Sequence, residues 1–494
     1  MITDALGNPP GDFGPAASRT ETDSFGSVEL PANALYGAQT QRSLQFFSIG
    51  EELLPWGMVR ALLAVKQACA QVNHDRGLLA TDVTELIARA CTELLGENAQ
   101  AAYRKHFPVR VWQTGSGTQS NMNVNEVVAN LANFYAGEAL GGKKPVHPND
   151  HVNRSQSSND VFPTAMHLYA IELLEQALLP AVDTLIAELA RLEKRYQAML
   201  ITGRTHLMDA LPLTLGHCFG AYRHQLQEAR AAIVATLGGA DSASAAGGLI
   251  ELAIGGTAVG SGANAPENFD RDVCTLLSAF YGRRLLPHPN KFAALSGQDA
   301  LLAAAQALVR LASVLHKMAN DIRLLASGPN SGIGELQLPA NEPGSSIMPG
   351  KVNPTQCEAM AMVCMQVSAQ VDAIEQAAAA GQLQLNTCRP MMIHNFGSAV
   401  GLLSDVQHSF ASHCLAGISV NEAAVQSHLD NNLMLVTFAA PELGYDNASK
   451  IARHALEQGC NIYQAAEKLG IMDAEPMRVL VEQRVRESLL QSQG

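Results

Sequence analysis

The sequence predicts a mainly all-α protein built around a long helical bundle. Hydrophobic residues make up 47% of the 494-residue chain and aromatic residues only 5%, so the core must be aliphatic. Such a core favours closely packed helices over sheets, which use more Tyr, Phe and Trp. Apolar residues also recur at helical spacing over long stretches. We expect these helices at 57–77, 164–199, 214–237, 269–281, 297–326, 354–380 and 396–418.

The chain is expected to have four parts. Residues 1–24 are rich in Gly, Pro, Asp and Thr and are predicted to be a disordered tail. Residues 25–156 are predicted to form an N-terminal domain, 157–420 a central helical bundle, and 421–494 a small C-terminal helical domain. The Gly/Ala/Ser-rich stretch 238–263 is predicted to be a long flexible connection.

Two further features refine the bundle. The run 164–199 contains Pro180, which predicts a kink. The run 354–380 is apolar nearly all round, and a helix apolar on all faces is buried on all faces. One chain cannot easily surround so many such helices. We therefore infer that the bundle continues into neighbouring subunits.

Charge and cysteine usage exclude several classes of protein. The formal net charge of −13 argues against binding to nucleic acid or to an anionic membrane, because both need clustered Lys and Arg. The nine cysteines are scattered without a CxxC pair, which favours reduced thiols in a cytoplasmic protein. The N-terminus resembles neither a secretory signal nor a transit peptide, and no apolar run spans a bilayer without interruption.

The most informative stretch runs from Gly344 to Pro354. Its glycines and prolines predict an irregular loop, and Asn353-Pro354 before a helical run reads as an N-cap followed by Pro at the first helical position. A loop that brings Ser345 and Lys351 to a helix N-terminus suits an anion. Simple turn chemistry for the serines and a solvated loop tip for Lys351 remain the alternatives.

Two other polar clusters each lie on a loop or helix end beside a long helix, within the polar loops predicted at 113–126 and 144–161. In Gly115–Glu126, the glycines allow close backbone approach, and the hydroxyls can donate to a carboxylate. An ordinary Gly/Ser turn is the alternative. The second cluster runs from His147-Pro148-Asn149-Asp150 to Ser157-Ser158-Asn159-Asp160. There Asn159 could simply be the N-cap of the helix that follows.

The remaining cluster, Gly203–Ala210, contains Thr205 and His206. Histidine is the natural proton carrier near neutral pH, although a single histidine is more often structural. Glu358, one turn into a helix, could orient and charge a histidine from another cluster. Favourable pairing with the helix dipole is its alternative role. The sequence has no P-loop, dinucleotide fingerprint or metal-ligand spacing, so we expect no metal and no cofactor. The inventory suits binding a small carboxylate and moving a proton beside it.

Together the four clusters resemble class II fumarase, within the fumarase/aspartase superfamily. The resemblance covers nearly all of the chain from about Ser24, including the segments 35–43 and 444–446. The pattern GSSxMPxKxNP is highly specific to the superfamily. Aspartases have Gln at the position of His206 and Ala at that of Gly350, so both positions here look like fumarase.

The resemblance implies a three-domain subunit and a homotetramer whose bundles form one twenty-helix core. Each active site would then be shared by three subunits. It implies reversible hydration of fumarate to (S)-malate, through an aci-carboxylate intermediate, in the tricarboxylic acid cycle.

The resemblance also implies residue roles. Ser345 matches the catalytic base, and His206, partnered by Glu358, matches the residue that holds the water or hydroxyl. Lys351 would also help to stabilise the developing charge. The positions expected to bind the substrate carboxylates are Ser116, Thr118, Ser157, Ser158, Asn159, Thr205, Lys351 and Asn353. His147, Asn149 and Asp150 match a second anion site.

Three departures from the family pattern leave the matched positions intact. The tail before Ser24 is longer, the stretch 238–249 looks inserted, and His217-Cys218 replaces the usual Gln-Glu. The rival functions are an aspartase-type ammonia-lyase and a catalytically dead structural protein. His206 and Gly350 argue against the first, and the intact site residues argue against the second.

Overall fold

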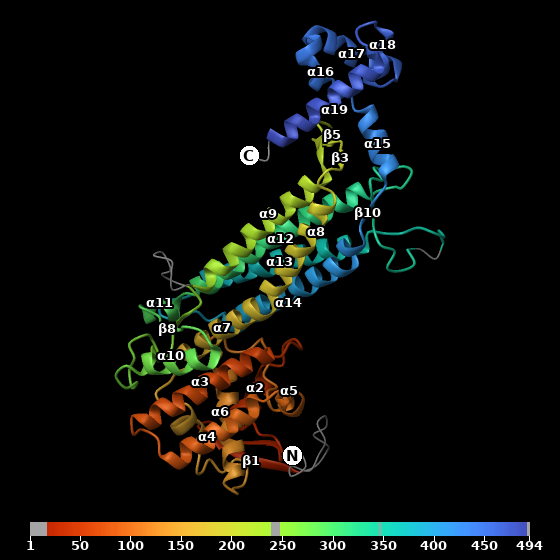
Figure 1. Cartoon of the computed structure of the whole chain (residues 1–494). Coiled ribbons are helices and arrows are strands. Elements are labelled where there is room, and N and C mark those ends of the chain that lie inside the picture. The colour runs from red at the N-terminus through yellow and green to blue at the C-terminus, as the bar shows by residue number, and fades with distance from the viewer. Residues whose placement is uncertain (1–16, 239–247, 345–346, 492–494) are drawn as a thin grey trace. The chain divides into compact units, whose positions relative to one another are not determined.

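The chain is mainly α-helical in a computed structural model that describes residues 17–238, 248–344 and 347–491 (Figure 1). The predicted all-α fold class is therefore confirmed. Within these residues, every named strand belongs to a two-stranded ladder. The chain divides into two compact units, each assembled from three separate stretches. Unit 1 comprises Met1–Pro180, Arg230–Ala312 and Met365–Leu403, and unit 2 comprises Ala181–Ala229, Ser313–Cys364 and Ser404–Gly494.

Five long helices each contribute residues to both units. Within unit 2, Arg223 of α9 donates to Glu193 of α8 at 2.6 Å. Within unit 1, Gln370 of α13 donates to Ser398 of α14 at 2.9 Å, and Figure 1 shows these two helices side by side. Three of them follow the predicted runs 214–237, 297–326 and 354–380 closely. One covers only the second part of the predicted run 164–199, and the last begins before residue 396 and ends before residue 418. The five are α8 (Leu179–Arg195), α9 (Leu215–Leu237), α12 (Asp299–Leu325), α13 (Thr355–Ala379) and α14 (Arg389–His413).

The predicted helix 164–199 is irregular immediately before its proline. Helix α7 (Ser158–Leu173) passes into a single π-turn, η3 (Leu174–Leu178), before α8 begins. Pro180 is the second residue of α8 and follows this π-turn directly. Proline cannot donate a hydrogen bond to the preceding turn, and π-turns often accompany bends in helices, so the irregularity falls where the kink was predicted. The kink itself stays a prediction.

The first part of unit 1 is a cluster of helices around α3 (Trp56–Asp75), which packs against helices α4, α7 and α10. Many of the α3 side chains are buried, as its apolar sequence ALLAVKQACA requires. The elements of this part are β1 (Ser18–Asp23), β2 (Gly26–Pro31), α2 (Ala38–Phe46), α4 (Thr81–Leu95), α5 (Ala99–Tyr103), η1 (Arg104–His106), α6 (Thr118–Tyr135) and η2 (Pro148–Val152).

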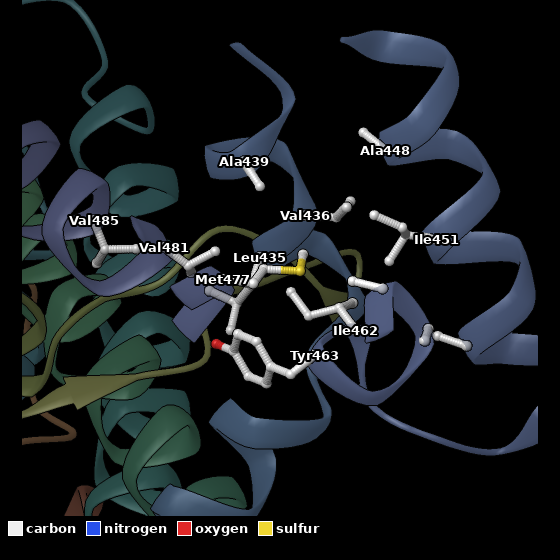
Figure 2. Packing of buried hydrophobic residues seen from close by; sticks show 13 residues of the cluster. Leu435, Val436, Ala439, Ala448, Ile451, Ile462, Tyr463, Met477, Val481 and Val485 are labelled. Carbon is white, nitrogen blue, oxygen red and sulfur yellow. The ribbon is translucent and has the colours of Figure 1, made fainter. Parts of the chain in front are cut away.

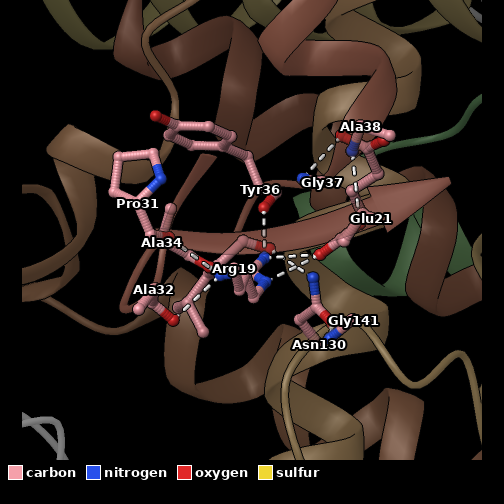
Figure 3. Close-up of polar contacts among 12 residues, drawn as sticks. Arg19, Glu21, Pro31, Ala32, Ala34, Tyr36, Gly37, Ala38, Asn130 and Gly141 are labelled. Carbon is pink, nitrogen blue, oxygen red and sulfur yellow. Dashed lines mark hydrogen bonds and ion pairs between the residues drawn. The ribbon is translucent and has the colours of Figure 1, made fainter. Parts of the chain in front are cut away.

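The predicted disordered tail 1–24 is too long. Residues 1–16 lie outside the described residues, but β1 pairs antiparallel with β2. Arg19 explains this order, because its guanidinium donates to the carbonyls of Pro31, Ala32, Ala34 and Tyr36 at 2.7–3.0 Å (Figure 3). The same guanidinium also contacts the Glu21 carboxylate at 2.6 Å. One planar group with five N–H donors thus holds the backbone from Pro31 to Tyr36 in place.

The Gly/Ala/Ser-rich stretch is also more ordered than predicted. Residues 239–247, most of the predicted insertion 238–249, lie outside the described residues. From Gly248 onward the segment packs, with Leu249 and Ile254 fully buried. The prediction of a flexible connection is therefore wrong for 248–263. The elements that follow α9 in unit 1 are β7 (Glu251–Leu252), its parallel partner β8 (Leu286–Pro287), α10 (Phe269–Tyr281) and α11 (Lys291–Ser296).

Unit 2 contains three small antiparallel ladders, which pair β3 with β6, β4 with β5, and β9 with β10. The aliphatic composition gave no hint of these ladders, since each strand has only two residues. Their bounds are β3 (Leu200–Ile201), β4 (Arg204–Thr205), β5 (Met208–Asp209), β6 (Leu213–Thr214), β9 (Leu336–Gln337) and β10 (Ser419–Val420).

The C-terminal part of unit 2 has its own hydrophobic core. Buried side chains from α16 to α19, including Ile451, Ile462, Met477 and Val481, converge in Figure 2. Asn461 starts α18 with a reciprocal capping box to Gln464, and Gly459, at φ +58°, ends α17. The elements are η4 (Leu415–Gly417), α15 (Glu422–Asn431), η5 (Leu433–Leu435), α16 (Val436–Leu443), α17 (Tyr445–Gln458), α18 (Ile462–Lys468) and α19 (Ala474–Gln491).

Among the described helices, α12 alone is long and apolar enough to cross a bilayer by length and composition. In its most apolar stretch, 44% of the residues are buried within the protein. Core helices of helical bundles share both properties.

Candidate active site

The first candidate cluster forms a tight turn at the start of α6. The Oγ of Ser116 and the Oγ1 of Thr118 lie 2.8 Å apart and are hydrogen bonded to each other. Gly117 between them has φ +81°, the left-handed region that favours glycine. The two hydroxyls therefore meet at a helix N-terminus, where free N–H groups favour an anion.

The glycines of this turn are needed because neighbouring groups approach closely. A Cβ on Gly117 would lie 2.2 Å from the Phe162 ring, and one on Gly115 would lie 1.4 Å from the carbonyl oxygen of Thr387. No side chain fits at either position. The turn is therefore shaped by close packing as well as by loop chemistry.

The rest of this motif is structural. Glu126, deep in α6, accepts hydrogen bonds from the backbone N–H groups of Gly37, Gln39 and Thr40 and from the Thr40 hydroxyl. Burial raises the pKa of this carboxyl group, while the four donors oppose that shift. Glu126 thus caps α2 and anchors the segment around residues 35–43.

The second cluster begins α7, and Ser157 is its cap. The Ser157 Oγ accepts from the N–H of Asn159 at 3.2 Å, and Asp160 completes a reciprocal capping box. The prediction that Asn159 could be the N-cap is wrong, because the helix already begins at Ser158. The Asn159 side chain donates instead to the Ala258 carbonyl at 2.7 Å.

Asp160 is buried beneath this helix start. Its carboxylate accepts from the N–H groups of Ser157, Gly255 and Thr257, each at 2.9 Å. Burial raises the pKa of Asp160, and the three backbone donors counter that rise. Asp160 therefore joins α7 to the ordered part of the Gly-rich stretch.

The residues of the predicted second anion site lie around η2, immediately before this cluster. His147 caps η2, and its Nδ1 accepts from the N–H groups of Asn149 and Asp150 at 3.2 and 3.1 Å. Burial lowers the pKa of His147 despite the nearby Asp150 carboxylate. Because Nδ1 is an acceptor, a neutral His147 carries its proton on Nε2. Asn149 and Asp150 are exposed.

In unit 2, Thr205 and His206 lie on a two-residue hairpin between β4 and β5. His206 and Leu207 form the turn at φ +56° and +62°, a left-handed pair that usually requires Asn or Gly. Side chains from Thr205 to Asp209 are exposed. A histidine held at a strained hairpin tip suggests a functional reason for its position.

The hairpin is held at its base by a buried ion pair. Arg204 donates to both carboxylate oxygens of Glu335, at 2.6 and 3.2 Å, and the Glu335 side chain is only 3% exposed. His428 of α15 contacts the same carboxylate at 2.7 Å through Nδ1. Three segments of unit 2 therefore meet at Glu335.

The predicted base, Ser345, lies with Ser346 outside the described residues. Around them, the Asn353 amide donates to the Gly344 carbonyl at 2.9 Å and closes the loop. Lys351 is exposed. Helix α13 begins at Thr355, and the N–H of Glu358 donates to the Pro354 carbonyl, so Pro354 rather than Asn353 occupies the N-cap position. The predicted cap is thus displaced by one residue.

The predicted residues therefore fall into two groups. Those at 116–118 and 147–159 lie in unit 1, and those at 205–206 and 351–358 lie in unit 2. Within the described residues, no hydrogen bond joins His206 to Glu358, so the predicted pair stays a prediction. The part of the chain that the structure describes contains no cluster of three or more His, Cys, Asp or Glu side chains suited to a metal ion.

Comparisons with known proteins agree with this architecture. A sequence model of a lyase family matches residues 26–369, and one of the fumarase C C-terminus matches residues 435–483. Fumarate hydratase class II of Pseudomonas putida is 50% identical over 458 residues, which are 93% of this chain and 96% of that protein. The chain belongs to the class II fumarate hydratase family. The resemblance found in the sequence is confirmed.

Other members of the class II fumarate hydratase family match equally broadly. The protein of Chlamydia pneumoniae is 47% identical over 463 residues, covering 94% of this chain and 98% of its own. The crystal structure of recombinant class II fumarase from Schistosoma mansoni matches with a TM-score of 0.88 and 38% identity. That match covers 94% of this chain and 98% of the other.

The buried charged residues that support the clusters in this class II fumarate hydratase family member were not predicted from the sequence. Arg389, fully buried, donates to the carbonyls of Asn159 and Leu295 at 2.9 and 2.6 Å. Lys66 is also fully buried, and Glu335 nearly so. The one available signal was a lysine within the apolar run ALLAVKQACA, since a buried charge needs a partner.

Proposed function

We propose that this chain catalyses the reversible, stereospecific hydration of fumarate to (S)-malate, as in the tricarboxylic acid cycle. The observation that carries this function is the 50% identity to the Pseudomonas putida class II fumarate hydratase across 93% of the chain. The substrate is a small dicarboxylate. The expectation that no metal or cofactor takes part stays a prediction.

In this proposal, the substrate carboxylates bind at two helix N-termini of unit 1. Ser116 and Thr118 offer hydroxyls at the start of α6, while Ser157, Ser158 and Asn159 lie at the start of α7. Hydroxyl donors and free backbone N–H groups at a helix start both favour carboxylate oxygens. In unit 2, Thr205, Lys351 and Asn353 provide the remaining substrate contacts.

The proton transfer belongs to Ser345 and His206. Ser345 removes the proton beside a malate carboxylate, and His206, charged and oriented by Glu358, holds the hydroxyl that leaves as water. Proton removal places a second negative charge on that carboxylate, giving the aci-carboxylate intermediate. Preformed donors such as Lys351 stabilise this charge more strongly than that of the ground state.

His147, Asn149 and Asp150 form a second anion site in this proposal. The exposure of Asn149 and Asp150 supports access from solvent. The loop that joins η2 to α7 connects this site to the substrate residues at the start of α7.

The proposed assembly is a homotetramer with a twenty-helix core and active sites shared by three subunits. Two methionines of α13, Met362 and Met365, are 63% and 55% exposed in the single chain, which supports burial against other copies. The domain limits 25–156, 157–420 and 421–494 and a cytoplasmic location belong to the same proposal.

An ultraviolet assay tests the function directly. Loss of the absorbance of fumarate's conjugated double bond should accompany malate formation, and malate should restore that absorbance. L-Aspartate is the control substrate, because an ammonia-lyase would deaminate it to fumarate. Turnover of aspartate without turnover of malate would overturn the proposal, and absence of both activities would support the rival structural role.

Mixing inactive variants tests the shared site. A Ser345→Ala chain co-expressed with a His206→Asn chain should form mixed tetramers that recover activity, because some sites then combine the intact copies of both residues. Each variant purified alone is the control. Mixed tetramers without recovered activity would show that a single chain supplies both residues.

A further inference from the structure

Lys66 is a buried lysine whose contacts lead toward the proposed substrate site. Its side chain, on α3, is fully buried in unit 1. The Nζ donates to the amide oxygens of Asn153 and Gln156, at 2.8 and 2.9 Å. Both amides lie on the loop that joins η2 to α7, so Lys66 anchors that loop to α3.

This loop connects the two proposed anion sites. His147 lies before it and Ser157 ends it. Asn73, two helical turns after Lys66 on the same face of α3, donates to the Arg154 carbonyl at 3.0 Å and accepts from the Ser155 hydroxyl at 2.7 Å. Helix α3 therefore clamps the loop at several points.

Helix α6 extends the network to the substrate hydroxyls. The Oδ1 of Asn153, which accepts from Lys66, also accepts from the amides of Asn121 and Asn125 at 3.2 Å each. The Asn121 amide also lies 3.3 Å from the Ser158 Oγ. A continuous series of hydrogen bonds thus runs from Lys66 to a hydroxyl of the proposed site.

The surroundings of Lys66 bring the pKa of its ammonium group close to neutral pH. Burial lowers the pKa of its ammonium group to about 7, against the opposing influence of Cys69, Asp160 and Cys91. These titratable groups come from α3, α7 and α4, in that order. Helix α10 contributes Cys274, which acts on Cys69, while α6 presents the neutral amides of Asn121 and Asn125. The contacted loop carries Arg154, which is exposed, and η2 carries Asp150 and His151.

The hydrogen bonds from Lys66 to Asn153 and Gln156 need only two of its protons. The neutral amine and the ammonium ion can therefore both hold the loop. A negative charge nearby decides between them, because it favours the ammonium form.

We propose that Lys66 is a positioning residue whose protonation is coupled to substrate binding, so that the protein takes up a proton when a dicarboxylate dianion binds. This proposal rests on the proposed function, because it requires an anion at Ser157–Asn159. For a ligand charge on the order of 10 Å away, an effective dielectric of about 20 gives a rise of about one pKa unit. Dicarboxylate affinity should then fall about tenfold between about pH 6 and pH 9.

Calorimetry with succinate tests the coupling without turnover, because succinate has no double bond to hydrate. Titrations in buffers of different ionisation enthalpy report the protons taken up per bound ligand. For pKa values of about 7 in the free and 8 in the bound protein, uptake should peak near pH 7.5 at about half a proton. An uptake maximum at or below about pH 6.5, where an ordinary histidine titrates, would overturn the proposal.

The variant Lys66→Met removes the titrating group, and its uptake near pH 7.5 should fall to that of the histidines alone. Lys450→Met, which removes an exposed lysine of α17, is the matched control and should behave as the wild type. Unchanged uptake in Lys66→Met would overturn the coupling. If Lys66→Met does not fold, the position of the wild-type maximum decides. Failure of the wild type to turn over fumarate would instead count against the proposed function.

Discussion

Arg204 donates to Glu335 at 2.6 Å, and this ion pair holds the base of the hairpin that presents His206. The Glu335 side chain is 3% exposed and that of Arg204 18%. Removing one partner of a buried pair leaves an unpaired buried charge. Arg204 is only two residues from His206, the candidate proton carrier. Loss of the ion pair should therefore also lower the rate of catalysis.

Glu335→Gln should therefore destabilise the protein by about 3 kcal/mol and lower kcat for fumarate. Chemical denaturation and steady-state kinetics measure the two effects. Arg484→Gln is the control, because Arg484 pairs with Glu487 at the surface and its loss should cost less than about 1 kcal/mol. Equal effects of the two variants would contradict a special role for the buried pair.

Gly117→Ala and Gly137→Ala form a matched pair at the two ends of α6. Both glycines have φ +81°, so alanine suffers the same backbone strain of about 1 kcal/mol at each. Only at Gly117 does a Cβ also meet the Phe162 ring, at 2.2 Å, whereas space is open around Gly137. Gly117→Ala should lose more stability, by roughly 1–3 kcal/mol, and raise the KM for fumarate. Similar melting temperatures for the two variants would show that the ring moves freely aside.

The left-handed hairpin turn predicts how substitutions at Leu207 rank. Asn adopts positive φ readily and a β-branched residue does not. Leu207→Asn should thus retain stability, whereas Leu207→Ile should lose on the order of 1 kcal/mol. Thermal denaturation of both variants, at equal protein concentration, gives the order. An isoleucine variant as stable as the asparagine variant would mean that the turn can change its conformation.

Lys66 predicts a pH dependence of stability. Its pKa of about 7 in the folded chain lies below that of an unfolded lysine, about 10.4, so the unfolded chain binds more protons between these values. The free energy of unfolding therefore gains a positive contribution as pH rises through this window, up to about 1.4 kcal/mol per pH unit. Denaturation of wild type and Lys66→Met between about pH 7.5 and 9.5 should show the smaller slope in the variant. Parallel curves would place the folded pKa outside the window.

Ser345→Ala tests the proposed base. It should lower kcat for both directions by at least about 100-fold, with a smaller change in KM, because the lost step is proton transfer. Initial rates with malate and with fumarate measure this. Ser346→Ala is the neighbouring control and should retain more activity. Full fumarate hydration by Ser345→Ala would sink the assignment.

Sequence reasoning recovered the elements that depend on local periodicity. The long apolar runs predicted α9, α10, α12 and α13 to within a few residues, because each helix is marked by apolar residues that recur at helical spacing along its length. It failed where distant groups decide the structure. Composition predicted disorder around Arg19, whose order comes from carbonyls up to residue 36, and flexibility after Gly248, whose order comes from Asp160.

The candidate site shows the same division. The cluster at 157–159 was placed correctly at a helix start. The cluster at 116–118 was assigned to a polar loop at 113–126, but most of that stretch is the first part of α6. Which residue caps each helix was not predictable, since Ser157, Ser158 and Asn159 are all good caps and tertiary contacts select among them. Lys66, Arg389 and Glu335 carried no local signal strong enough to separate a buried charge from a surface one.

Arg19 sets a practical limit on how far the chain can be shortened. Because its guanidinium collects four carbonyls between Pro31 and Tyr36, an engineered form that begins at Ser24 would release the backbone leading into α2. Any trimmed version for crystallisation or biocatalysis should therefore begin before Arg19. A truncation at Ser24, which composition alone would allow, would remove the Arg19 contacts that hold the N-terminal segment.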